Sequence, residues 1–129
     1  MAIVVLDASV VIAFLDGADA HHAAAVEAIG RTRHEDLVIP SSAYAETLVD
    51  PWRRGSDAVA IVKRFLMELG VRIEPLTAAM AERAARLRSD RRTLRLPDAL
   101  VSATADVLGA TALTCDRSWP RVSRRARIV

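Results

Sequence analysis

The chain has 129 residues, a length that suits one domain with one hydrophobic core. Hydrophobic residues make up 52% of it, which argues against a disordered protein, and the single cysteine, Cys115, excludes an internal disulfide framework and fits a reducing compartment. The net charge is +2, and aromatic residues make up 4%, so we do not expect stacking on an aromatic platform to hold nucleic acid. No targeting segment is visible, and we expect a cytoplasmic protein.

The chain begins with an apolar run that contains one acid, "IVVLDASVVIAFL". It is shorter than the roughly 20 residues of a membrane span, and it lacks the basic leader of a signal peptide. We therefore expect a buried strand at Ala2–Leu6, then a helix from about Ser9. Asp7 falls at the carboxyl end of that strand, where the ligands of open α/β sheets bind. An alternative is that Asp7 or Ser9 simply caps the helix.

The middle of the chain alternates helices with short strands. We expect helices at Ala20–Arg31, from Ser41 or Ser42 to about Asp50, and at Asp57–Leu69. Pro51 should end or bend the second of these helices, and Gly70 should stop the third. The expected strands are Asp36–Ile39 and Val71–Glu74.

The last third follows the same alternation. Thr77 should cap a helix that runs to about Arg88, and Pro97 suits the first turn of a helix that runs to about Leu108. Ala110–Leu113 and the short Arg127–Val129 read as strands. This order predicts an α/β protein: a three-layer α/β/α sandwich with a central parallel sheet of four to five strands, in a single domain over residues 1–129.

Four acids stand in apolar surroundings: Asp7, Glu46, Asp98 and Asp116. Asp7 and Asp116 follow predicted strands, and Asp98 lies in the first turn of a helix. Glu46 lies one turn into its helix, and its side chain should lean back toward the helix start. All four should therefore meet at the carboxyl edge of the sheet.

Four carboxylates at one point repel each other unless a cation is present. The ligands would all be oxygens, so the ion should be hard, Mg²⁺ or Mn²⁺. Such an ion can polarise a phosphodiester and activate a water for in-line attack. Asp7, Asp98 and Asp116 would hold the metal, while Glu46 would complete the shell or act as a base for the water.

At these residues the sequence resembles the PIN-domain family, and in particular the VapC ribonuclease toxins of bacterial and archaeal toxin–antitoxin pairs. The matching stretches are "VVLDASVVIAFL", "VIPSSAYAETL" and "LRLPDALVSATADVLGATALTCD", which together span the chain nearly end to end. The family's acidic quartet carries over onto the same four acids, and its small polar residue onto Thr114. Ser9 also fits the pattern and would orient Asp7 or a bound water.

The resemblance implies an endoribonuclease, a cognate VapB-type antitoxin that blocks the cleft, and a homodimer. One position departs from the family: some members carry a further acid where this chain has Ser118. A second metal would then be held weakly, or only with help from an RNA phosphate.

Two other functions compete with this hypothesis. A HAD-like phosphatase also begins with an acid after its first strand, but it needs a second acid two residues later, where this chain has Ser9. The other is a non-catalytic PIN-like module that binds RNA or a protein. Metal dependence of RNA cleavage separates that module from the nuclease.

Arginine supplies almost all of the basic charge, because Lys63 is the single lysine. Six arginines lie between Arg83 and Arg95, and five lie between Arg117 and the end of the chain. Such clusters either bind phosphates or form a solvated surface. We expect the tail arginines to lie beside the cleft and bind RNA; the candidates are Arg121, Arg124 and Arg125.

Overall fold

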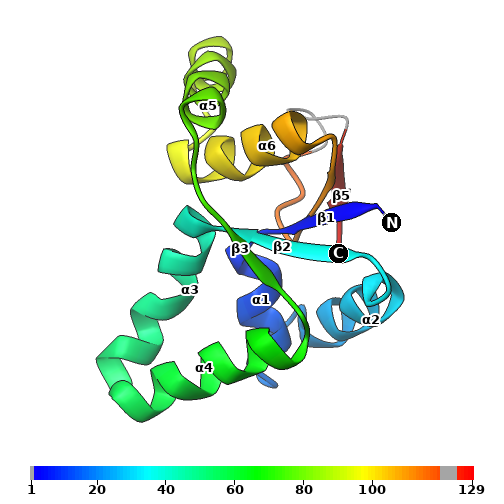
Figure 1. Cartoon of the computed structure of the whole chain (residues 1–129), viewed down its shortest axis with the longest axis vertical. Helices are drawn as coiled ribbons and strands as arrows, with labels where there is room; N and C mark the ends of the chain where they lie inside the picture. The colour runs from blue at the N-terminus through cyan, green and yellow to red at the C-terminus, as the bar shows by residue number, and fades with distance from the viewer. Residues whose placement is uncertain (1, 120–124) are drawn as a thin grey trace.

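The computed structural model describes residues 2–119 and 125–129. In this part of the chain, five parallel strands form one sheet in the order β3-β2-β1-β4-β5 (Figure 1). The strands are β1 (Ile3–Leu6), β2 (Asp36–Pro40), β3 (Arg72–Glu74), β4 (Thr111–Thr114) and β5 (Ala126–Ile128). The helices are α1 (Ala8–Leu15), α2 (His22–Thr32), α3 (Ser41–Arg54), α4 (Ser56–Glu68), α5 (Ala78–Asp90) and α6 (Leu96–Leu108).

The order in which the chain adds strands reverses at β1, in the centre of the sheet. From β1 the chain adds β2 and β3 on one side, then returns to add β4 and β5 on the other. Val5 of β1 lies between Val38 of β2 and Ala112 of β4. Connections that leave β1 and β4 in opposite directions open a crevice at the carboxyl ends of these strands, where α/β proteins bind ligands.

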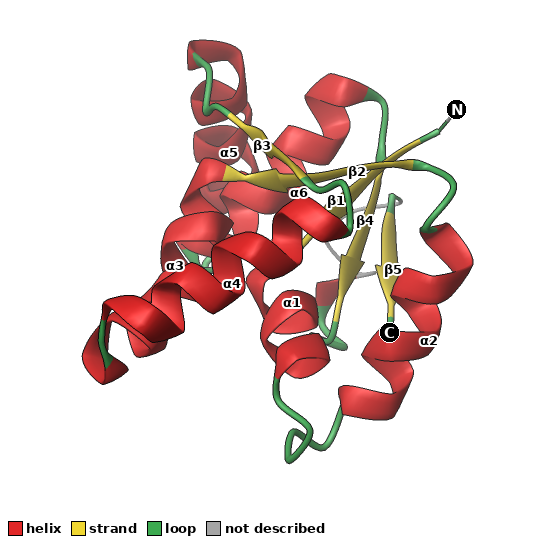
Figure 2. Ribbon diagram, turned by 60° about the horizontal axis from the view of Figure 1, so that its bottom comes forward, coloured by secondary structure: helices red, strands yellow, loops and turns green. Residues whose placement is uncertain are grey.

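Helices cover both faces of the sheet, as the sequence predicted. The pair α5 and α6 lies on one side, while α1, α2 and α4 lie on the other (Figures 1 and 2). The central strands are therefore buried on both faces, and Val5, Leu6 and Val38 are completely inaccessible. This explains their continuous apolar sequence, because a parallel strand that is covered on both faces cannot alternate with polar residues. The fold is the predicted α/β/α sandwich.

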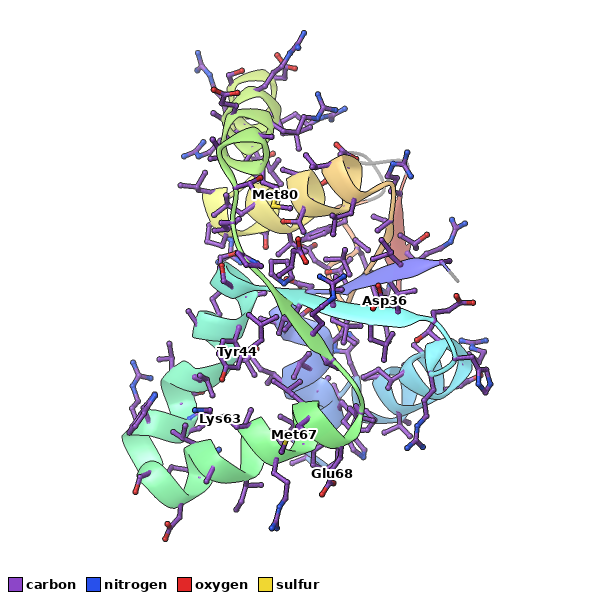
Figure 3. The ribbon with its side chains drawn as sticks, in the orientation of Figure 1. Asp36, Tyr44, Lys63, Met67, Glu68 and Met80 are labelled. Atoms are coloured by element: carbon purple, nitrogen blue, oxygen red, sulfur yellow. The ribbon has the colours of Figure 1, made fainter. Side chains whose placement is uncertain are left out.

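A second, smaller apolar cluster joins α5 to α6. Ala84, Leu94, Ala99 and Ala103 are buried together there. Met80 lies between the two helices (Figure 3) and is 1% exposed. This contact fixes α6, and α6 carries one of the four acids.

Some details differ from the sequence-based expectation. Pro51 does not end its helix, because α3 continues to Arg54 with Pro51 buried inside it and the Gly55 N–H donating to the Pro51 carbonyl at 3.0 Å. Pro40 and Gly55 occupy the N-cap positions of α3 and α4, and neither makes a side-chain capping hydrogen bond. The Thr77 cap is confirmed, since its hydroxyl accepts a hydrogen bond from the Met80 N–H at 3.2 Å.

No helix in the described residues is both long enough and apolar enough to cross a membrane.

Candidate active site at the carboxyl edge of the sheet

The crossover connections bring three helix starts to one edge of the sheet. Helices α1 and α3 leave the carboxyl ends of β1 and β2, and α6 runs antiparallel to the strand that follows it, so it begins at the same edge. Asp7 stands between β1 and α1, and its backbone N–H donates to the Leu113 carbonyl of β4 at 3.0 Å. That hydrogen bond ties together the two strand ends that carry Asp7 and Asp116.

Two hydroxyl groups hold the Asp7 carboxylate. Ser9 Oγ and Thr114 Oγ1 both donate to Asp7 Oδ2, at 2.5 Å and 3.1 Å. Asp7 is 7% exposed and Thr114 is completely buried, so water does not compete for these bonds. Among the described residues none donates to Asp7 Oδ1, which leaves that oxygen available to a ligand. The alternative that Asp7 caps α1 is wrong, because its side chain makes no capping hydrogen bond.

The same hydroxyls also receive hydrogen bonds from the loop that carries Asp116. The Cys115 N–H donates to Ser9 Oγ at 3.1 Å, and the Asp116 N–H donates to Thr114 Oγ1 at 3.0 Å. Each hydroxyl therefore links the backbone of this loop to the carboxylate of Asp7. The positions of Asp7 and Asp116 are coupled through Ser9 and Thr114.

Sequence reasoning missed the role of Ser118. Its backbone N–H and its hydroxyl both donate to Asp116 Oδ1, at 2.9 Å and 2.8 Å. The signal was present in the sequence, because an Asp side chain commonly accepts a hydrogen bond from the backbone two residues later. Where some relatives carry another acid, this chain has a residue that orients Asp116 without adding charge.

Sequence reasoning also missed a specific contact of Arg95. Its Nε lies 3.3 Å from Asp98 Oδ2 and forms an ion pair with it. Asp98 is 9% exposed, whereas the Arg95 side chain is 74% exposed. The pair therefore joins a nearly buried acid to a cation that reaches into solvent.

The electrostatics connect all four acids. Burial raises the pKa of Asp98, Arg95 opposes that shift, and the negative charges of Asp7 and Asp116 add to it. Partial desolvation raises the pKa of Glu46, and the charges of Asp7 and Asp98 raise it further. The charge of Arg95 again works against the shift. Each acid thus lies within the electric field of at least one other.

The donor set suits a hard cation, but the acids are not arranged as a finished metal shell. Within residues 2–119 and 125–129, no three His, Cys, Asp or Glu side chains are grouped so that they could hold an ion. Asp98 Oδ2 is engaged by Arg95, whereas Asp7 Oδ1 has no donor among the described residues. The available ligands are carboxylate oxygens, which suit hard ions such as Mg²⁺ or Mn²⁺. Their mutual repulsion also favours binding of a cation.

A cavity of about 480 Å³ adjoins the acids through Glu46. It lies between α1, α3 and α4, and its walls include Ile12, Leu15 and Val62. Glu46 therefore stands between the acidic edge and a partly apolar hollow.

Of the three candidate tail arginines, the structure describes Arg125, and it does not lie beside the acids as expected. Arg121 and Arg124 lie outside the described residues. Arg125 comes just before β5, and its carbonyl accepts a hydrogen bond from the Ala112 N–H at 2.9 Å. Because β5 runs parallel to β4, Arg125 lies at the amino edge, and its Nε is 3.8 Å from Asp106 of α6. The expectation that the tail lies beside the cleft is therefore wrong for Arg125.

A parallel α/β/α sandwich with acids at the switch point of its sheet defines the class of protein, and sequence comparison assigns the family. The chain belongs to the PIN-domain family, whose sequence model, "PIN domain", matches residues 4–125. No curated protein sequence matches the chain significantly.

Solved structures that share the fold include a VapC toxin and VapBC complexes. VapBC2 from Rickettsia felis, bound to a DNA fragment from its promoter, has a TM-score of 0.82 at 15% identity, with 98% of each chain covered. DNA-bound VapBC from Salmonella typhimurium has a TM-score of 0.79 at 16% identity, with 100% of this chain and 98% of that chain covered. Mycobacterium tuberculosis VapC20, a toxin that cleaves the sarcin–ricin loop, has a TM-score of 0.74 at 24% identity, with 92% and 93% covered. At these identities the likeness concerns the fold.

Proposed function

We propose that this protein is a metal-dependent endoribonuclease and the toxin of a VapBC-type toxin–antitoxin pair. One observation carries the proposal: at the switch point of a parallel sheet, the charges of Asp7 and Asp116 act on Asp98, and those of Asp7 and Asp98 act on Glu46. Such repulsion lowers stability unless the site serves to bind a cation. Membership of the PIN-domain family supports a nuclease, and the toxin neighbours support the biological role.

The proposed metal ligands are Asp7, Asp98 and Asp116. Mg²⁺ or Mn²⁺ bound there would polarise the scissile phosphate and lower the pKa of a water. Ser9 and Thr114 keep Asp7 Oδ1 available by holding the other oxygen. Ser118 does the same for Asp116.

Glu46 is the proposed base for the attacking water. Desolvation and neighbouring acids raise the pKa of its carboxyl, which makes the carboxylate a stronger proton acceptor. Its place between the acidic edge and the cavity between α1, α3 and α4 would let it receive that proton without itself holding the phosphate.

The structural neighbours also support a proposal about the partners of this protein. Several structural neighbours are toxin–antitoxin complexes, from Rickettsia felis, Salmonella typhimurium and Klebsiella pneumoniae. We propose a VapB-type antitoxin that blocks the cleft, and a homodimer. RNA binding by Arg121 and Arg124 stays a prediction.

One observation favours the alternative of a non-catalytic PIN-like binding module. No three acidic side chains among the described residues are positioned to coordinate one ion. A protein that used this edge for binding alone would not need such a group.

A cleavage assay decides between the two functions. The purified protein is incubated with total RNA in Mg²⁺, in Mn²⁺ and in EDTA, and new RNA ends are sequenced. The nuclease proposal requires discrete ends that appear with either metal and disappear with EDTA. RNA that is bound but not cut under all three conditions would favour the binding module, and the mapped ends would identify the cleaved sequence.

A further inference from the structure

Arg95 holds a position that the proposed chemistry does not explain. It occupies the N-cap position of α6, three residues before Asp98, and makes no capping hydrogen bond. Its Nε contacts Asp98 Oδ2 at 3.3 Å, while the rest of the guanidinium has no hydrogen-bond partner among the described residues. Arg95 therefore uses one of its five N–H donors and offers the others to solvent.

The ion pair also conflicts with metal binding. An oxygen of Asp98 that accepts from a guanidinium is not fully available to a metal ion, and the cation itself repels a second cation. Conversely, an ion that takes Asp98 releases Arg95 at the mouth of the site. A guanidinium freed there would lie beside Asp98 and exposed to solvent, and its planar fork matches phosphate oxygens.

We propose that Arg95 exchanges partners: it pairs with Asp98 in the metal-free protein and binds an RNA phosphate once a metal ion has taken Asp98. This inference rests on the proposed nuclease function. In the metal-free state Arg95 offsets part of the repulsion between the acids, as the raised pKa of its guanidinium beside Asp98, Glu46 and Asp116 also indicates. In the metal-loaded state it adds a positive charge beside the substrate.

The first measurement is Mn²⁺ affinity without RNA, by calorimetry on the full chain. Arg95→Gln should bind Mn²⁺ about two- to fivefold more tightly than the wild type, the range expected when a partly exposed ion pair is removed. Arg95→Lys keeps the charge and should stay close to the wild type. Arg92→Gln is the matched control, because Arg92 lies on the same loop, is exposed and forms no ion pair among the described residues. It should change little.

The second measurement uses an RNA oligonucleotide that carries the cleavage site mapped by end sequencing. With saturating Mn²⁺, Arg95→Gln should raise KM severalfold and leave kcat within about twofold, as loss of a binding contact does. In EDTA its dissociation constant for the same RNA should match that of Arg92→Gln, because Arg95 is then paired with Asp98. The effect of the substitution on RNA affinity thus depends on the metal.

The outcomes separate this inference from the proposed function. Weaker Mn²⁺ binding by Arg95→Gln would overturn the exchange, since Arg95 would then support Asp98 rather than compete for it. An equal loss of RNA affinity with and without Mn²⁺ would also overturn it, because that is the signature of diffuse attraction. In both cases, Mn²⁺ binding and RNA cleavage by the wild type would still support the proposed nuclease function. If the wild type neither binds Mn²⁺ nor cuts RNA, both the nuclease function and the partner exchange are contradicted.

Discussion

The two edges of the sheet treat their acids differently. At the amino edge, Asp36 pairs with Arg72 at 3.2 Å, and Asp106 pairs with Arg83 at 3.0 Å. At the carboxyl edge, Asp7 and Asp116 accept hydrogen bonds from hydroxyl and backbone N–H groups, which carry no charge. Asp98 alone of the four acids has an ion pair among the described residues.

The comparison indicates what each edge is built for. An arginine beside an acid both orients it and cancels its charge. Hydroxyl and amide donors orient an acid while its negative charge remains, so several such acids together attract a cation. The amino edge is therefore satisfied within the protein, whereas the carboxyl edge is ordered but electrically incomplete. Substitutions at the two edges should have different consequences.

The largest expected effect comes from Asp98→Asn. Asn keeps the size of the side chain but loses the charge that holds the metal. RNA cleavage should fall by at least about 100-fold, because even the outer partners of metal ligands are worth about 10- to 100-fold. The metal-free protein should be as stable as the wild type or more stable, since repulsion between acids is relieved.

Asp36→Asn is the control for that substitution, because it removes an acid from the amino edge (Figure 3). It should leave the cleavage rate unchanged. Undiminished cleavage by purified Asp98→Asn would remove the four-acid site from the mechanism.

Metal should stabilise the wild type through the carboxyl edge. At a concentration 100 times its dissociation constant, an ion that binds the folded state alone raises the free energy of unfolding by about 2.7 kcal/mol. We expect Mg²⁺ or Mn²⁺ to raise the Tm of the wild type and to leave that of Asp7→Asn/Asp98→Asn unchanged. Thermal melts with and without EDTA measure this. Equal shifts in both proteins would locate the ion elsewhere.

Thr114→Val should test the neutral donors of the carboxyl edge. Valine has the same shape, but it leaves the Asp116 N–H without its acceptor and Asp7 without one donor. We expect a loss of about 1–3 kcal/mol in urea unfolding, the cost of unsatisfied buried polar groups. Mn²⁺ affinity should fall about 10- to 100-fold.

Thr104→Val is the matched control for Thr114→Val. Thr104 is equally buried, but its hydroxyl donates only back to the Leu100 carbonyl of its own helix, at 2.8 Å. This substitution should leave Mn²⁺ affinity unchanged and cost less stability. Equal metal affinities for the two variants would show that Thr114 has no role in orienting the acids.

The raised pKa values of Glu46 and Asp98 predict how stability depends on pH. The folded protein retains protons on these groups at pH values where the unfolded chain has already lost them. Their contribution therefore stabilises the metal-free protein at low pH and is lost as pH rises from the unfolded pKa values through the raised folded ones. Each group contributes a slope of at most about 1.4 kcal/mol per pH unit.

Urea unfolding at several pH values in EDTA tests this dependence. Asp98→Asn and Glu46→Gln should each remove part of the slope, while Asp36→Asn should leave it unchanged. A slope that survives in the double variant Glu46→Gln/Asp98→Asn would assign it to other groups.

The sequence predicted the fold because the apolar periodicity of the strands and helices determines it, and it predicted four acids at one edge of the sheet, although no three acids among the described residues are grouped so that they could hold an ion. A buried apolar strand followed by Asp7, and acids near the starts of helices, can converge only at the carboxyl edge of a parallel sheet. Single hydrogen bonds were not predictable in the same way. The contacts of Ser118 and Arg95 depend on loop conformation and side-chain rotamers. The expectation that Pro51 ends its helix was wrong, because α3 continues to Arg54 with Pro51 buried inside it.

The position of Arg125 was predicted wrongly for a topological reason. Arg125 lies only nine residues after Asp116 in the sequence, and that closeness suggested a place beside the cleft. A parallel β5 requires the chain to return to the amino edge before the strand starts, so Arg125 lies at the opposite end of the sheet from Asp116. Nearness in sequence does not mean nearness in space across a parallel connection.

The smallest expected effect follows from that position. Arg125→Gln removes a charge at the amino edge, beside Asp106, so it should leave the salt dependence of RNA binding unchanged. A lost phosphate contact on single-stranded RNA would instead lower the slope of log K against log salt by about 0.7. Titrations of the mapped RNA oligonucleotide at several salt concentrations measure this, with Arg95→Gln in Mn²⁺ as the comparison that should lower the slope. A drop of similar size for Arg125→Gln would extend the RNA-binding surface to the amino edge and break the contrast between the two edges.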